Sequence, residues 1–198
     1  MPKRKYTRKK RKYVTKRSFP FMLMKHAEPK HVELERKAQE LNGAGADIIP
    51  LNEIDRGTTV GSRNGNEVQL TGFYFRGYTS KSTAALTPTD STYMVRVVIY
   101  TPREMVDAAM DTQPGDLIDK EKYIIWKDIL VPVPWANSIR GNTFVLKHRF
   151  KPYMKVIWNS ATNDDFVKGP LYMNIGTDSP STNNVKYSIQ GRTYFRDI

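Results

Sequence analysis

The 198-residue sequence contains no cysteine, which excludes disulfide bonds, thiolate zinc sites and cysteine nucleophiles in one step. It also lacks any apolar run near the roughly 18 residues that a membrane-spanning helix requires. The apolar segment Phe19–Met24 is too short for a secretory signal. These absences predict a soluble protein without a membrane anchor, folded in an intracellular compartment.

Familiar catalytic motifs are absent too, among them the G-x-S-x-G elbow, the P-loop, G-x-G-x-x-G and H-E-x-x-H. Of the three histidines, His26 and His31 lie in the entry segment. His148 lies on the apparent inward face of a strand, where a packed side chain is more common than a catalytic base. We therefore predict no catalytic residue, no cofactor and no enzymatic activity.

An enzyme that acts on nucleic acid would need clustered carboxylates to hold metal ions. Asp164 and Asp165 form the most concentrated acidic pair of the sequence. They could take a hard cation such as calcium at a subunit contact, although a solvated loop is the more common arrangement for such a pair. We predict no metal site.

Acidic residues are absent from the first 17 positions, which hold ten basic ones. The ten are Lys3, Arg4, Lys5, Arg8, Lys9, Lys10, Arg11, Lys12, Lys16 and Arg17. The remaining residues carry 22 bases and 20 acids, so a chain of net charge +12 has a body of only +2. The positive charge is therefore concentrated in one terminal segment.

Such a block, almost without aliphatic residues, cannot bury enough apolar surface to offset the entropy of ordering it. We predict a disordered basic arm over residues 1–18 and a linker over 19–30. The partner best matched to the arm is a nucleic acid, whose phosphates release condensed counterions on binding. An anionic membrane would attract the same charges, but no amphipathic helix or lipidation site adjoins them.

Two further features of the arm bear on its partners. Tyr6 and Tyr13 could stack on unpaired bases. The run Lys9, Lys10, Arg11 and Lys12 matches the short basic pattern of a nuclear localisation signal, which would add a host nuclear import receptor to the partners.

Beyond residue 30 the sequence consists of short runs of alternating polarity, separated by Gly/Asn/Asp/Pro/Ser clusters such as 63–66 and 114–116. This pattern predicts one all-β domain over residues 31–198, a sandwich or a barrel. The expected strands are Val32–Ala38, Asp47–Ile54, Glu67–Thr79, Thr92–Thr101, Lys122–Val133, Thr143–Lys151, Tyr153–Asn159, Gly169–Gly176 and Val185–Phe195.

Two segments have helical character. Residues 31–41 contain good helix formers, but their apolar positions fit a strand equally well, and the sequence does not decide between the two. Residues 102–111, which begin with Pro102, favour a short helix in a loop between strands.

Two of the expected strands have well-defined faces. Tyr93, Val95, Val97 and Ile99 share one face of the first, and Phe144, Leu146, His148 and Phe150 share one face of the second. The opposite face of the second strand presents Lys147, Arg149 and Lys151. These three bases either form a solvated face that resists aggregation or a second phosphate-contacting surface, and we include them among the nucleic-acid-binding candidates.

The segment 47–80 carries a more specific pattern, formed by Leu51, Asn52, Ile54, Gly57, Arg63, Gly65, Asn66, Val68, Arg76 and Gly77. It resembles the capsid proteins of the satellite tobacco necrosis virus-like type, including those of many circular Rep-encoding single-stranded DNA (CRESS-DNA) viruses. Residues 123–133, with the pair Lys127 and Asp128, the basic strand 144–159 and the late strand 169–176 are similar to further strands of that family.

This resemblance implies an eight-stranded antiparallel jelly roll, made of two packed four-stranded sheets. It also implies a capsid protein of which sixty copies close a T=1 icosahedral shell around a single-stranded genome. Sixty arms would carry about 600 positive charges, comparable in order to the phosphates of one or two thousand nucleotides. The nuclear signal favours DNA over RNA, with the protein in the virion and, during assembly, in the host nucleus.

The alternative from another class is a cellular nucleic-acid-binding protein, ribosomal or chromatin-associated, with a basic tail on a β domain. Such a protein should spread its bases over the folded body to hold structured nucleic acid. The nearly neutral body of this chain favours a container instead.

Overall fold

A computed structural model describes residues 30–41, 46–81, 93–104, 110, 112–133, 141–159, 162, 165–179 and 185–198. These residues form nine β-strands and no helix, which confirms the all-β prediction. Hence no helix in this part of the chain is long and apolar enough to cross a membrane. The predicted arm, 1–18, and nearly all of the linker lie outside the described residues.

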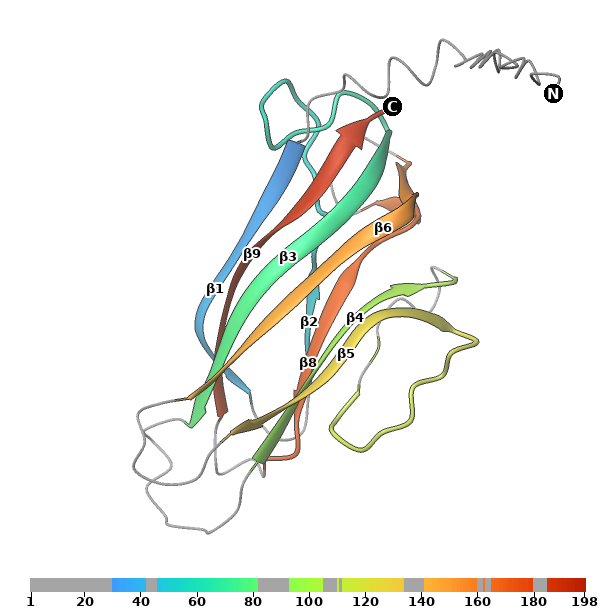
Figure 1. Cartoon of the computed structure of the whole chain (residues 1–198). Helices are drawn as coiled ribbons and strands as arrows, with labels where there is room; N and C mark the ends of the chain where they lie inside the picture. Colours follow the sequence, from blue (N-terminus) through green and yellow to red (C-terminus); the bar gives the residue numbers. More distant parts are fainter. Residues whose placement is uncertain are drawn as a thin grey trace, which may run out of the picture.

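The strands make two antiparallel sheets that pack face to face (Figure 1). The first sheet has the order β1-β9-β3-β6-β7 and the second has the order β2-β8-β4-β5. Their bounds are β1 Lys30–Leu41, β2 Asp47–Pro50, β3 Glu67–Lys81, β4 Tyr93–Pro102, β5 Tyr123–Val133, β6 Asn142–Trp158, β7 Phe166–Lys168, β8 Tyr172–Thr177 and β9 Val185–Asp197.

The pairing of the strands is nested. With the short β7 set aside, β1 pairs with β9, β2 with β8, β3 with β6 and β4 with β5, so the first strand meets the last and the middle strands meet each other. This is the double Greek key of a jelly roll. The prediction of two four-stranded sheets is wrong by one strand, because β7 adds to the first sheet at Ile157 and Trp158.

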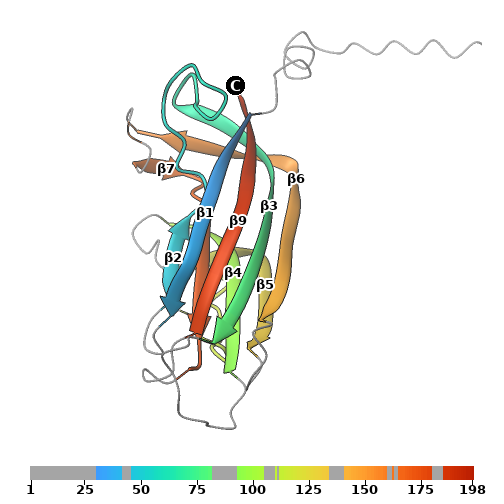
Figure 2. The same ribbon diagram turned by 90° about the vertical axis from the view of Figure 1, so that its left-hand side faces the viewer.

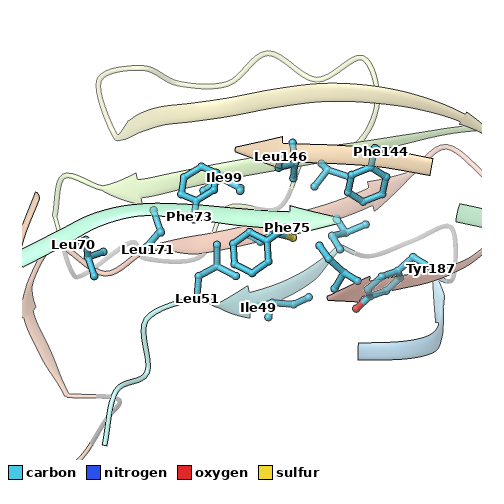
Figure 3. Close-up of a cluster of buried hydrophobic side chains, with 14 of the residues drawn as sticks. Ile49, Leu51, Leu70, Phe73, Phe75, Ile99, Phe144, Leu146, Leu171 and Tyr187 are labelled. Carbon is cyan, nitrogen blue, oxygen red and sulfur yellow. The ribbon is translucent and has the colours of Figure 1, made fainter. Parts of the chain in front are cut away.

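The core lies between the two sheets (Figure 3). Because side chains alternate along a strand, β3 contributes Phe73 and Phe75, and β6 contributes Phe144 and Leu146. The face predicted for Tyr93, Val95, Val97 and Ile99 is buried as expected.

β4 is also buried on its other side. Val98, Tyr100 and Met110 form a second apolar cluster, which Ile118 and Tyr123 help to cover. The described part of the loop between β4 and β5, with Met110 and Ile118, therefore lies over the outer face of the second sheet. Most of the predicted helix at 102–111 falls outside the described residues, and Pro102 is the last residue of β4.

Residues 31–41 form a strand. Val32 and Leu34 pack against the core from β1, and the strand bulges between Arg36 and Gln39, where Ala38 has φ 48°. Burial against a neighbouring sheet thus outweighs the helix propensity of this segment.

Two strands predicted on either side of Pro152 are one continuous strand, β6. Proline has no N–H to give to a ladder, so it is tolerated in strands mainly at edges and bulges. Pro152 occupies such a place, since the β3–β6 register shifts between Leu70 and Gly72, opposite this part of β6.

Candidate nucleic-acid interface

The basic face predicted for β6 is present. Lys147, Arg149 and Lys151 are all exposed, whereas Phe144, Leu146 and Phe150 are buried. His148 shares the inward face and is partly buried. The period of two therefore separates a packed face from a cationic one along a single strand.

The outer face of the first sheet has a charge gradient across its strands. In register, Lys147 of β6 lies opposite Tyr74 of β3, Tyr74 opposite Arg192 of β9, and Arg192 opposite Glu33 of β1. Arg192 donates to Glu33 at 2.9 Å. The acids Glu33 and Glu35 thus offset the charge near β1, and the side near β6 remains basic.

Arginines and tyrosines pair on this outer face. The guanidinium of Arg76 lies 5.4 Å from the ring centre of Tyr74, and that of Arg196 lies 5.8 Å from the ring centre of Tyr153. Stacked guanidinium and aromatic groups can also receive nucleic-acid bases.

β6 and β5 lie at the same margin of the sandwich (Figure 2). β5 is the last strand of the second sheet, and in the described part of the chain no strand pairs with the outer edge of β6 ahead of Ile157. Trp126 of β5 bridges the two strands. The centre of its ring lies 5.3 Å from that of His148 and 4.8 Å from that of Phe150. Its Nε1 donates to Thr101 Oγ1 at 2.9 Å.

His148 is held among aromatic rings, as its inward position predicted. Its ring stacks on Phe73 with centres 5.7 Å apart. Burial, and then the charge of Lys127, lower the pKa of His148 below its ordinary value of 6.5. The neutral form is favoured, so His148 adds little positive charge to this margin at neutral pH.

The residues that carried the family resemblance have structural roles. Asn52 is fully buried; its Nδ2 donates to the Gly169 carbonyl at 3.2 Å, and its Oδ1 accepts from the Leu171 N–H at 2.9 Å. It therefore fastens the segment after β2 to the chain that enters β8.

Arg63 is also fully buried. It donates to the carbonyls of Ile54 at 2.9 Å and Thr162 at 3.0 Å, and its guanidinium lies 4.5 Å from the ring centre of Trp158. Burial, followed by the nearby Arg56, lowers its pKa. Arg63 thus organises the loop between β2 and β3, and it is not accessible to a phosphate.

Asp128 does not use its neighbour Lys127 as its partner. Its carboxylate receives two bonds from Arg96 of β4, at 3.0 and 2.7 Å. Arg96 also donates to the Asp116 carbonyl at 2.6 Å, which ties the long loop to the outer face of the second sheet. This pair is a structural clamp.

The ten basic candidates of the arm, with the nuclear-signal residues among them, lie outside the described residues, as do His26 and Asp164. Asp165 is described, at the start of the segment that leads into β7. Within the described part of the chain, no group of three or more His, Asp or Glu side chains could hold a metal ion.

Sequence reasoning missed one feature of the interface, a groove at the β5–β6 margin. Its lining comes from the end of β4, from β5, from β6 and from β7. No local pattern marks such a set, because only the nested pairing brings these segments together.

No protein-family model and no curated protein matches this sequence. Among solved structures, the chain is similar to one in the cryo-EM atomic structure of Broad Bean Stain Virus, with 11% sequence identity and a TM-score of 0.37. The match covers 81% of this chain and 85% of that one. The strand order, independently of this match, assigns the jelly roll.

Proposed function

We propose that this protein is a viral capsid protein, whose jelly-roll domain assembles with copies of itself into a closed shell and whose basic arm packages a single-stranded genome. The observation that carries the proposal is the separation of charge. Ten of the 32 bases, and none of the 20 acids, lie in the first 17 residues, ahead of a body of net charge +2.

That separation fits a container. A nearly neutral domain can pack against many copies without mutual repulsion, whereas a strongly basic body would resist crowding. The arm supplies the attraction for phosphate instead. The jelly roll is a recurrent architecture of capsid subunits, which adds support at the level of the fold.

The attachment point of the arm is consistent with this division. The described body begins at Lys30, whose Nζ contacts Asp197 at 2.7 Å at the far end of β9. Residues 1–29 therefore join the body at one end of the first sheet, the sheet that carries Lys147, Arg149 and Lys151. We assign these three side chains to phosphate contacts that supplement the arm.

The finer features of the proposal follow from the sequence pattern. We propose a sixty-copy T=1 shell of the satellite tobacco necrosis virus-like type, as in CRESS-DNA viruses, with DNA favoured over RNA. Lys9, Lys10, Arg11 and Lys12 would direct the protein to the host nucleus through an import receptor, and the mature location would be the virion.

Sedimentation of the full-length recombinant protein tests the proposal. Sixty copies of a 22.8-kDa chain should sediment as closed particles of about 1.4 MDa. Electron micrographs of the same fraction should show uniform shells. A monodisperse monomer or dimer across salt and pH would contradict the proposal and favour a cellular nucleic-acid-binding protein.

A further inference from the structure

A groove of about 720 Å³ lies at one margin of the sandwich, lined by β6 and β7 of the first sheet and by β5 and the end of β4 of the second. Its volume falls in the range of about 300–1,000 Å³ that is usual for ligand pockets. Figure 1 shows β6 beside β3, on the side of the first sheet that lies away from β1. The described lining of the groove therefore belongs to the jelly-roll domain.

The rim of the groove is strongly cationic. Five bases line it: Arg103 from the end of β4, Arg149, Lys151 and Lys155 from β6, and Lys168 from β7. No carboxylate is among the described residues that line it. In a body with nearly balanced charge, this is a local excess of one sign.

Three of these cations form no ion pair with another described residue. Lys155 contacts Glu67 at 2.7 Å, and Arg103 donates to the Lys120 carbonyl at 3.3 Å. Among the described residues, no ion pair involves Arg149, Lys151 or Lys168. Unpaired cations around a concave site favour an anionic ligand.

The floor and wall of the groove are aromatic and apolar. Trp126, His148 and Tyr153 line it, together with Ile124 and Met154. Tyr153 is 39% exposed, and Trp126 is held in place by its bond to Thr101. Fixed rings beneath a cationic rim are the combination with which proteins hold single-stranded nucleic acid, bases on the rings and phosphates on the cations.

We infer that this groove binds a short stretch of single-stranded nucleic acid, with a base against Tyr153 or Trp126 and neighbouring phosphates at Arg149, Lys151 and Lys168. The inference rests on the proposed packaging function and assigns a site on the body to it. A segment of a second copy is the competing occupant, but the described lining holds no carboxylate and has three cations without an ion pair among the described residues, which favours phosphate. A single-stranded partner is required because a base in a duplex cannot leave its stack without cost.

Photo-crosslinking of the full-length chain tests this inference. An oligodeoxynucleotide that contains 5-iodouracil is irradiated with the protein, and the modified peptides are mapped by mass spectrometry. We expect adducts on Tyr153 or Trp126 in addition to adducts on the arm. The triple variant Arg149→Gln, Lys151→Gln, Lys168→Gln should lose the body adducts and keep those of the arm.

Salt dependence supplies a second measurement. Each phosphate contact to a single strand contributes about 0.7 to the slope of log K against log salt concentration, so the triple variant should lower the slope by about 2. The matched control is the triple variant Lys37→Gln, Lys81→Gln, Lys186→Gln, which removes the same charge from the opposite end of the sheet. It should change the slope less.

Adducts confined to the arm, or equal slopes for the triple variant and its control, would overturn the inference and leave the packaging proposal intact. If empty particles that assembled before the oligonucleotide was added give arm adducts but no groove adducts, the inference would also be overturned, in favour of a second copy as the occupant. Failure of the wild-type chain to bind the oligonucleotide at all would contradict the packaging proposal itself.

Discussion

Arg63 is a buried cation whose donors hold a loop. An arginine is seldom buried without several partners, and here the carbonyls of Ile54 and Thr162 and the ring of Trp158 supply them. The sequence pattern singled this residue out, but it could not tell whether the charge faces a ligand or the loop. The structure places it in the loop, so it joins Asn52 among the residues that define the fold.

His148 makes stability depend on pH. Its folded pKa lies below the ordinary value of 6.5, so the unfolded chain binds more protons in the interval between the two. The stabilisation from the neutral ring is complete above pH 6.5 and is lost as the pH falls from 6.5 towards the folded pKa. We expect His148→Phe to flatten this dependence, since Phe can keep the stack on Phe73.

Urea unfolding of the full-length chain at several pH values between 7 and 5 measures the effect. Lys127→Met removes the second cause of the shift and should flatten the curve in part. The carboxylates also make the unfolding free energy depend on pH. That contribution is the same in wild type and in each variant, so it cancels when a variant is compared with wild type. Equal slopes for wild type and His148→Phe would show that His148 is not the group responsible.

At the scale of the element, β3 and β6 are neighbours in the first sheet and approach closely at Gly77. Gly77 is paired directly with Phe144, and a Cβ added to Gly77 would lie 2.0 Å from the Phe144 ring. The ring therefore occupies the space of a side chain. This contact fixes which residue of β6 lies over which residue of β3.

Gly77→Ala should destabilise the domain by about 1–3 kcal/mol, the usual cost of overpacking a filled core. The control is Gly65→Ala in the loop before β3, where an added Cβ would meet nothing within 4 Å. We expect the control to remain within about 0.5 kcal/mol of wild type. The midpoints of urea unfolding measure both variants, and a loss in Gly65→Ala as large as in Gly77→Ala would refute the packing argument.

The sequence predicted the faces of the strands well and their connections less well. The alternation of apolar and polar residues correctly predicted that Val95 is buried and Lys147 exposed. Successive side chains of a strand point to opposite faces whatever the strand pairs with, so this feature can be predicted locally. The alternation failed at Pro152, where the register shift between β3 and β6 makes a proline tolerable, and at β7, which is too short to show a period. It also missed the second apolar cluster, since a loop covers the outer side of β4.

At the scale of the whole molecule, positive and negative charges are separated in two places. The sequence itself shows the first division, between the arm and the body. The second lies within the first sheet, where acids gather at β1, and at β6 and β7 gather cations, three of which form no ion pair with another described residue. This second division depends on strand order and was not accessible from composition.

Among the described strands, the same order leaves two unpaired edges at one margin, that of β5 and that of β6 ahead of Ile157. Exposed edges invite pairing with other chains, and proteins protect them with charged side chains. Arg149 and Lys151 are exposed charged side chains of this kind. In a shell they would hold phosphate, so one set of cations can prevent unwanted sheet growth before assembly and bind cargo afterwards.

Removal of residues 1–17 tests the division between arm and body. The shortened chain falls from a net charge of +12 to +2, because ten bases and no acids are lost. If packaged phosphate follows net positive charge, we expect nucleic acid per particle to drop about sixfold while shells still form, with or without a change in size. The ratio of absorbance at 260 and 280 nm of nuclease-treated particles measures the cargo.

A matched variant separates charge from residue identity. Changing Arg4, Arg8, Arg11 and Arg17 to Lys keeps all ten positive charges and should package as wild type does, because counterion release depends on the number of charges. Replacement of all ten bases by Gln should reproduce the deletion. Full cargo in the deleted form would show that the arm does not package the genome, and the body, with its groove, would then have to hold the nucleic acid alone.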